Sequence, residues 1–349
     1  MAKIVIHAGM PKTGSTSIQR WIVEQRDDLH RQHGVQILVA NRRTPGTPSD
    51  GVRLEPYENE ADDVSSNWLL WTWFAADRPP DIPRRFFEDL SELADEHATV
   101  LITAEGLSHA FTLDELFILG CERLAERHDV VVAIYVRPQH GAIESDWRQA
   151  GYKHRERRPS QWVRNQTRRL RYLRVLDAFR DLAPSVTLGM RPFVPGLLDG
   201  GSPVKDFARR FLVLDDEQAD LHANPTLPLE LVNLLRHAPD GWFWTWTENV
   251  DLERYPRERV AEVFAGLEIP ESPRIHRSRL VVREHCHTTF EHENQELIRR
   301  LDWPIAEFVP HADGLQGSWD LTELDTLWEP EASASERALI YHTLRRALD

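Results

Sequence analysis

The sequence predicts an α/β fold with a central parallel sheet, flanking helices and a helical C-terminal extension. Strand-length apolar runs alternate with amphipathic helical segments up to about residue 190, which is the βαβ pattern of a parallel sheet. The runs at residues 3–8 and 129–136 are nearly continuous in apolar residues, as expected for strands buried on both faces. From Pro203 onward the spacing is mostly helical. We therefore expect one domain over 1–310 and an extension over 311–349.

The first elements follow from local signals. Residues 3–8 predict a buried strand, and the apolar face of Ile18, Trp21, Ile22 and Leu29 predicts a helix from Ser15 to His33 that ends at Gly34. A second strand is expected over 35–39. Residues 41–66 are rich in Pro, Gly and acidic residues, and we interpret them as a long loop that serves as an acceptor lid.

The later elements continue the alternation. We expect a helix from Pro83 to His97, a strand from Thr99 to Glu105, and a helix from Leu113 to His128. The apolar strand 129–136 follows, and another strand ends at Phe193. The C-terminal extension has its own helix, opened by the capping box Ser333-x-x-Glu336.

The turn between the first strand and the first helix is the most informative segment. It contains Gly9, Lys12 and Gly14. A glycine-bearing strand–turn–helix joint exposes backbone N–H groups beside the positive helix end, which favours an anion. Gly9 and Gly14 have the glycine spacing of the nucleoside-triphosphatase P-loop, but Ser15 stands where that loop has its lysine. A purely structural alternative is that the small polar residues only cap the helix.

Each residue type in this turn suits an anion. Gly14 has no Cβ, so backbone can approach closely. The hydroxyls of Thr13, Ser15 and Thr16 are additional donors. Lys12 is a point cation suited to charge that grows on a leaving oxygen.

A second notable segment lies at the end of the strand 129–136. Arg137 ends that strand, Pro138 suits a first helical position, and Ser145 follows Arg137 by eight residues on the expected helix. At helical pitch Gly141 shares a face with Ser145, which leaves room for a ligand. The alternative is a surface arginine with a serine that faces solvent.

An acidic residue lies at the end of the strand 99–105. Glu105 emerges from a buried strand end, where partial desolvation raises a carboxyl pKa. Alternatively, Glu105 caps the helix near Leu113 or pairs with an arginine. His109 follows in the same segment and is the other side chain there that could exchange a proton near neutral pH.

Together these residues resemble a known family. The run Pro11-Lys-Thr-Gly-Ser-Thr16 resembles the 5′-phosphosulfate loop of sulfotransferases that use 3′-phosphoadenosine 5′-phosphosulfate (PAPS), and His7 and Gly9 resemble its bacterial members. Arg137 and Ser145 match the spacing of the family's 3′-phosphate ligands. Glu105 occupies the position of the base in the heparan sulfate N-sulfotransferase type. The segment ending at Phe193 resembles a later strand of the family that ends in R-P-[FY].

The resemblance implies a P-loop kinase-like sheet and a sulfuryl transfer from PAPS, which leaves the bisphosphate PAP, with no metal. It implies cofactor binding by residues of the turn and of the later strand: Lys12, Thr13, Gly14, Ser15, Thr16, Ser17, Arg137 and Ser145. It implies catalysis by Lys12 and Glu105. The chain departs from the family at Gly106, where animal N-sulfotransferases have lysine, and at Ser17, where some relatives have tryptophan.

The acceptor is open: a hydroxyl, or an amine, on a saccharide, lipid or secondary metabolite. Two tryptophan clusters, one over 68–73 and one over 242–246, suit either core packing or an acceptor pocket. Two other classes of protein stay open, a small-molecule or nucleotide kinase with an atypical P-loop and a non-catalytic PAP-binding protein.

Composition bounds the partners and the compartment. The formal net charge of −14 argues against nucleic acid as a partner. No apolar stretch approaches the roughly 20 residues of a membrane helix, and a strand that begins at Lys3 leaves no room for a signal peptide. With only Cys121 and Cys286, a disulfide framework is excluded, so we expect a cytoplasmic protein. A homo-oligomer is left open.

Overall fold

The computed structural model describes residues 1–10, 13–42, 52–57, 81–105, 107, 115–150, 158–215, 229, 232–233, 272–304, 320–329, 333, 335 and 337. The chain divides into two compact units, each assembled from separate stretches of sequence. The first contains 1–138, 171–223 and 292–308, and the second contains 139–170, 224–291 and 309–349. The predicted boundary at residue 310 stays a prediction.

A single sheet organises the first unit. Within the described residues it has six strands in the order β3-β2-β4-β1-β5-β6, and all neighbouring pairs are parallel except β2 with β3. The strands are β1 (Lys3–Gly9), β2 (Val35–Arg42), β3 (Val52–Pro56), β4 (Thr99–Glu105), β5 (Asp129–Val136) and β6 (Thr187–Pro192). The predicted α/β class with a central, mostly parallel sheet is confirmed.

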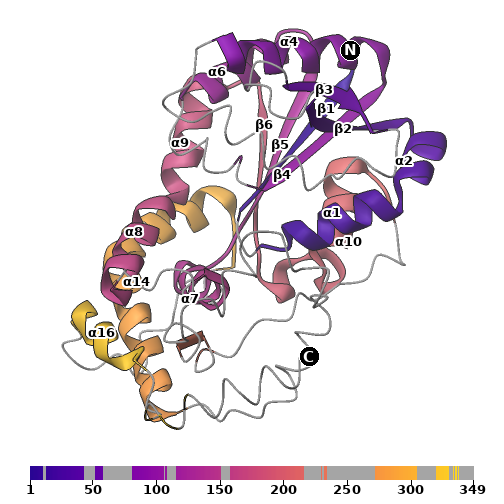
Figure 1. Ribbon diagram of the computed structural model, residues 1–349. Helices are drawn as coiled ribbons and strands as arrows, with labels where there is room; N and C mark the ends of the chain where they lie inside the picture. Colours follow the sequence, from indigo (N-terminus) through magenta and orange to yellow (C-terminus); the bar gives the residue numbers. More distant parts are fainter. Residues whose placement is uncertain are drawn as a thin grey trace. The chain divides into compact units, whose positions relative to one another are not determined.

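Helices cover both faces of this sheet. One face carries α1, α2 and α10 and the other carries α4, α6 and α9 (Figure 1). Their bounds are α1 (Ser15–Glu24), α2 (Arg26–His33), α4 (Asp81–Glu96), α6 (Glu115–Ala125), α9 (Tyr172–Leu182) and α10 (Pro203–Phe207). Short 3-10 turns, η4 (Pro195–Leu197) and η5 (Asp199–Gly201), precede α10, and the π-helical turn η6 (Ala208–Leu212) follows it.

Two local predictions differ from the structure. The helix expected from Ser15 to His33 is broken at Gln25. Asp27 and Asp28 lie in the first turn of α2, where acidic side chains favour a new helix start. Part of the loop expected over 41–66 is also wrong, because 52–56 pairs with β2 as strand β3. The missed signal is the alternation around Leu54, whose side chain is buried.

A buried carboxylate on α10 connects that helix to β5, β6 and η5. Asp206, on α10, is 0% exposed. It accepts hydrogen bonds from the Tyr135 hydroxyl at 2.9 Å, from Arg191 Nε at 3.1 Å and Nη2 at 2.8 Å, from the Asp199 backbone N–H at 3.1 Å, and from Arg210 Nε at 3.1 Å. These bonds tie α10 to β5, to β6 and to η5, so one side chain connects four elements.

Two opposing effects, burial and hydrogen bonding, set the pKa of Asp206. Burial raises the pKa of this carboxyl, but hydrogen bonds from Arg191 and from the Asp199 backbone outweigh burial and hold the pKa below its ordinary value. A lowered folded-state pKa gives stability that is present above the unfolded pKa and is lost as the pH falls through the folded value.

We predict that Asp206→Asn lowers the free energy of unfolding by about 3–5 kcal/mol at pH 7, because two guanidinium groups lose their buried partner. The difference from wild type should shrink as the pH falls below about 4. Urea unfolding at several pH values measures both effects.

Asp215→Asn is the control. Asp215 is 73% exposed in its ion pair with Arg209, and exposed pairs contribute about 1 kcal/mol or less. Equal losses in the two variants would contradict the role assigned to Asp206.

The second unit contains α7 (Gln139–Ala150), α8 (Pro159–Arg169), most of the long helix α14 (Pro273–Leu301), η7 (Leu321–Glu323) and α16 (Leu324–Leu327). Its core is aromatic. Trp147 stacks on Trp328 with ring centroids 4.6 Å apart and meets Trp162 edge to face at 5.7 Å. Asp325 accepts hydrogen bonds from the backbone N–H and the hydroxyl of Ser160, which caps α8.

Candidate functional site

The sheet register brings the ends of three strands together. Gly9, at the end of β1, pairs with Glu105 at the end of β4. On its other side β1 pairs with β5, which leads into Arg137. Since parallel neighbours end at the same edge of a sheet, three segments that the sequence singled out meet at one edge.

This edge is also a topological switch point. From β1 the chain crosses to β2 on one side of the sheet, and from the adjacent β5 it crosses to β6 on the other side. In open α/β sheets such a divergence leaves a crevice outside the strand ends, where ligands bind. The topology therefore marks the turn after β1 as the candidate site.

The turn after β1 is closed by its own hydroxyl groups. Thr13 Oγ1 donates to the Met10 carbonyl at 2.8 Å, and Ser15 Oγ donates to the same oxygen at 3.1 Å. Both side chains are buried. A hydroxyl has one donor, so each must leave Met10 before it donates to an anion. In this conformation these two hydroxyls shape the turn, and backbone N–H groups remain available to an anion.

The start of α1 carries an uncompensated positive end. Gly14 is its N-cap residue, with φ +79°, and makes no side-chain cap. The first turn has no acidic residue. The helix dipole and the first-turn N–H groups therefore favour an anion at this end.

Two side chains from beyond β6 form a wall against Gly14. A Cβ at Gly14 would lie 2.8 Å from Pro203 Cγ and 2.9 Å from Phe193 Cε2. Atoms do not approach that closely without displacement. The turn thus requires glycine for its backbone conformation and for the space that Pro203 and Phe193 occupy.

Phe193 also contacts the second anion candidate. The Arg137 guanidinium lies 6.0 Å from the centroid of the Phe193 ring, within cation–π range. The Phe193 N–H donates to the Val136 carbonyl at 2.7 Å, and the Tyr172 hydroxyl donates to the Arg137 carbonyl at 2.9 Å. One aromatic ring therefore connects the Arg137 strand end with the Gly14 turn.

In the sequence, Phe193 is notable only as the last residue of a segment that resembles the family's R-P-[FY] strand end. Its contacts with Gly14 and Arg137 depend on β6 lying beside β5, which local periodicity does not reveal. The available signal was the aromatic residue directly after a buried strand.

His7 lies on β1 beneath this site as a neutral side chain. It is fully buried, its Nδ1 is 2.8 Å from the Thr103 hydroxyl, and its ring packs against Phe207 at 5.1 Å. Burial lowers the pKa of His7 to about 3. His7 is therefore uncharged near neutral pH and is unsuited to proton transfer there.

The structure describes only some of the remaining predicted site residues. Lys12, His109 and both tryptophan clusters lie outside the described residues. For Glu105 the structure describes the backbone, as the last residue of β4. Ser17 is buried and Thr16 half-buried at the start of α1. The catalytic roles of Lys12 and Glu105 stay predictions.

Ser145 lies on α7 in the second unit and is 8% exposed. Arg137 belongs to the first unit. Their shared role at a 3′-phosphate stays a prediction.

The sequence matches no protein-family model, no curated protein and no solved structure. Among the described helices, none combines the length and apolar character needed to cross a membrane. Over the same residues, no group of three or more His, Cys, Asp or Glu side chains could hold a metal ion.

Gly14→Ala tests the close approach at the turn. We predict that it lowers the free energy of unfolding by at least about 1 kcal/mol more than Gly34→Ala does, because only the former adds a clash to the cost of a left-handed alanine. Gly34 has φ +63°, but no atom lies within 4 Å of the position that its Cβ would take. Urea unfolding of both variants provides the measurement, and equal losses would mean that Pro203 and Phe193 do not confine the turn.

Proposed function

We propose that this protein is a PAPS-dependent sulfotransferase that transfers a sulfuryl group to an acceptor hydroxyl, or to an amine, on a saccharide, lipid or secondary metabolite. The supporting observation is the convergence at one sheet edge. The turn after β1, the end of β4 and the end of β5 were each assigned a role from sequence, and the register makes them neighbours. The finer fold type, a P-loop kinase-like sheet, is part of this proposal.

The turn fits the phosphosulfate end of this cofactor. The uncapped start of α1 offers N–H groups and positive dipole to an anion. Gly14 adds no side chain of its own there, and the Pro203 and Phe193 side chains pack against it. Lys12 adds the cation for charge on the oxygen that bridges phosphorus and sulfur. The resemblance assigns Arg137 and Ser145 to the 3′-phosphate, a role that would select PAPS over ATP.

The cofactor supplies an activated sulfuryl group. In the proposed transfer the acceptor oxygen or nitrogen would bond to sulfur as the bond between sulfur and the bridging oxygen breaks, with PAP as the leaving group. Glu105 takes the proton of the acceptor, and Lys12 offsets the negative charge left on the 5′-phosphate. His7, on the strand that carries the turn, has a pKa too low for it to act as a second base near neutral pH.

The cofactor assignment is tested by isothermal titration calorimetry with PAP, AMP and ATP. We expect PAP to bind more tightly than AMP, and Arg137→Gln to weaken PAP by about 10–100-fold while AMP is unchanged, because a lost bond to a charged phosphate costs roughly 1.5–3 kcal/mol. Arg174→Gln, an exposed arginine on α9, is the control and should bind PAP like wild type.

Two outcomes would reassign the protein. Preferential, magnesium-dependent binding of ATP with phosphoryl transfer would indicate a kinase. Tight PAP binding without transfer to any member of an acceptor panel would indicate a non-catalytic PAP-binding protein.

Glu105→Gln tests the general base separately from the cofactor site. We predict that it lowers turnover by about 10²–10⁴, because glutamine cannot accept the proton, while PAP affinity is retained. Steady-state turnover with radiolabelled PAPS and calorimetry with PAP measure the two quantities. If the variant loses PAP affinity and keeps its turnover, Glu105 belongs to the binding site and another group is the base.

A further inference from the structure

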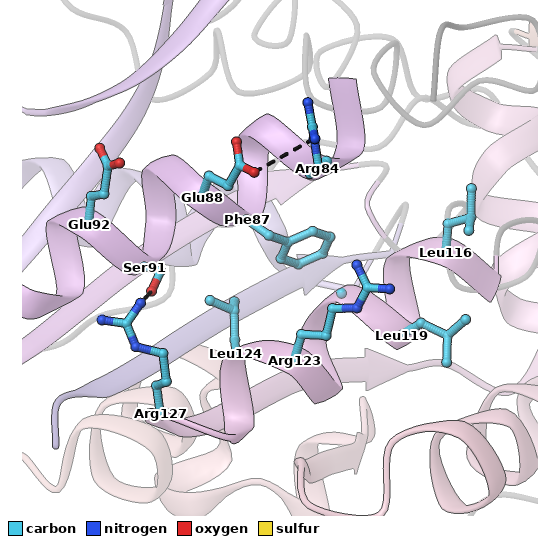
Figure 2. A pocket seen from close by; sticks show the side chains of 11 residues that line it. Arg84, Phe87, Glu88, Ser91, Glu92, Leu116, Leu119, Arg123, Leu124 and Arg127 are labelled. Atoms are coloured by element: carbon cyan, nitrogen blue, oxygen red, sulfur yellow. Dashed lines mark hydrogen bonds and ion pairs between the residues drawn. The ribbon is translucent and has the colours of Figure 1, made fainter. Parts of the chain in front are cut away.

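A groove on the first unit lies between α4 and α6, on the sheet face that those helices cover. It has a cavity volume of about 410 Å³, which is within the range of small-molecule sites. Phe87, Leu116, Leu119 and Leu124 line it, and Figure 2 shows Phe87 and Leu124 facing the space between the two helices. Leu116 is 54% exposed and Leu119 38% exposed on successive turns of α6. Apolar side chains thus form a half-open hollow.

Gly120 sets the shape of the floor. A Cβ at this position would lie 2.0 Å from Phe87 Cε2, so the Phe87 ring occupies the space of a missing side chain. A glycine inside a helix is less favourable than alanine. At position 120 the missing side chain lets the Phe87 ring lie directly on α6. A side chain at position 120 would push the Phe87 ring away from α6 and into the groove.

The arginines that line the groove differ in whether they form ion pairs. Arg84 pairs with Glu88 at 3.6 Å. Arg127 donates to Asp95 at 2.6 Å and to Ser91 at 3.0 Å. Among the described residues Arg123 makes no ion pair, and its guanidinium stands beside Phe87 and Leu119 in Figure 2.

The acidic residues of the lining do not compete for Arg123. Glu88 points to Arg84, and the carboxylate of Glu92 points away from α6 (Figure 2). Within the part of the chain that the structure describes, the interior therefore presents an apolar floor with one uncommitted guanidinium. Its complement is an apolar body that carries a single anionic group, and a carboxylate matches the planar fork of arginine.

We propose that the groove between α4 and α6 binds a free medium- or long-chain carboxylate, with the acyl chain along Phe87, Leu119 and Leu124 and the carboxylate on Arg123. The site is separate from the strand edge assigned to PAPS and does not depend on that assignment.

The test is calorimetry of the full-length protein with decanoate below its micelle concentration, and with decyltrimethylammonium as a probe of equal chain length and opposite charge. We expect saturable, one-to-one decanoate binding that Arg123→Gln weakens by about tenfold, the size of a lost charge-assisted pair. Arg174→Gln should leave decanoate affinity unchanged. PAP affinity should be the same in Arg123→Gln as in wild type, which separates this site from the proposed cofactor site.

The proposal is overturned by any of three results: no saturable decanoate binding, equal affinity for decyltrimethylammonium, or equal weakening by Arg123→Gln and Arg174→Gln. Thermal unfolding of both variants checks that each is folded, and an unfolded Arg123→Gln is replaced by Arg123→Lys. Lysine keeps the charge but loses the bidentate fork, so Arg123→Lys should bind decanoate more weakly than wild type and more tightly than it binds decyltrimethylammonium.

Discussion

The parallel register of β1 between β4 and β5 is the constraint on which the candidate site depends. Because Gly9 lies opposite Glu105 and β5 continues to Arg137 on the other side, groups separated by more than 90 residues share one sheet edge. From Ile4 to Gly9 the central strand is apolar on both faces except at His7, which burial keeps neutral. Hydrophobic burial thus holds the polar turn in place.

The turn is also fixed from outside the strand that carries it. Asp206 holds α10 against β5 and β6 through buried hydrogen bonds, and Pro203 begins α10 directly over Gly14. Phe193 fills the space between Gly14 and Arg137. A charge network and two apolar side chains therefore determine how closely a ligand approaches the start of α1, which links the stability of the fold to the proposed cofactor site.

Much of the first unit could be predicted from the sequence because its signals are local. The apolar runs of β1 and β5, the amphipathic face of α1 and the left-handed Gly34 all appear where expected. The break at Gln25 was not predicted because the apolar face of the helix continues to Leu29, while Asp27 and Asp28 begin a second helix. Strand β3 was not predicted because its local signal is weak and it forms by pairing with β2. The hydrogen bonds of Thr13 and Ser15 to Met10 were missed for a related reason: a sequence shows a hydroxyl but not its acceptor.

By itself the sequence determined the class of fold, the strand–turn–helix joint and the residue types that suit an anion, because these follow from periodicity, glycine placement and side-chain chemistry. Only the tertiary structure decided the strand order, and with it which strand ends are neighbours. It also decided that Phe193 lies between Gly14 and Arg137 and that Arg123 stands beside an apolar groove. Those relations join residues that are distant along the chain, and they are fixed by the packing of whole elements.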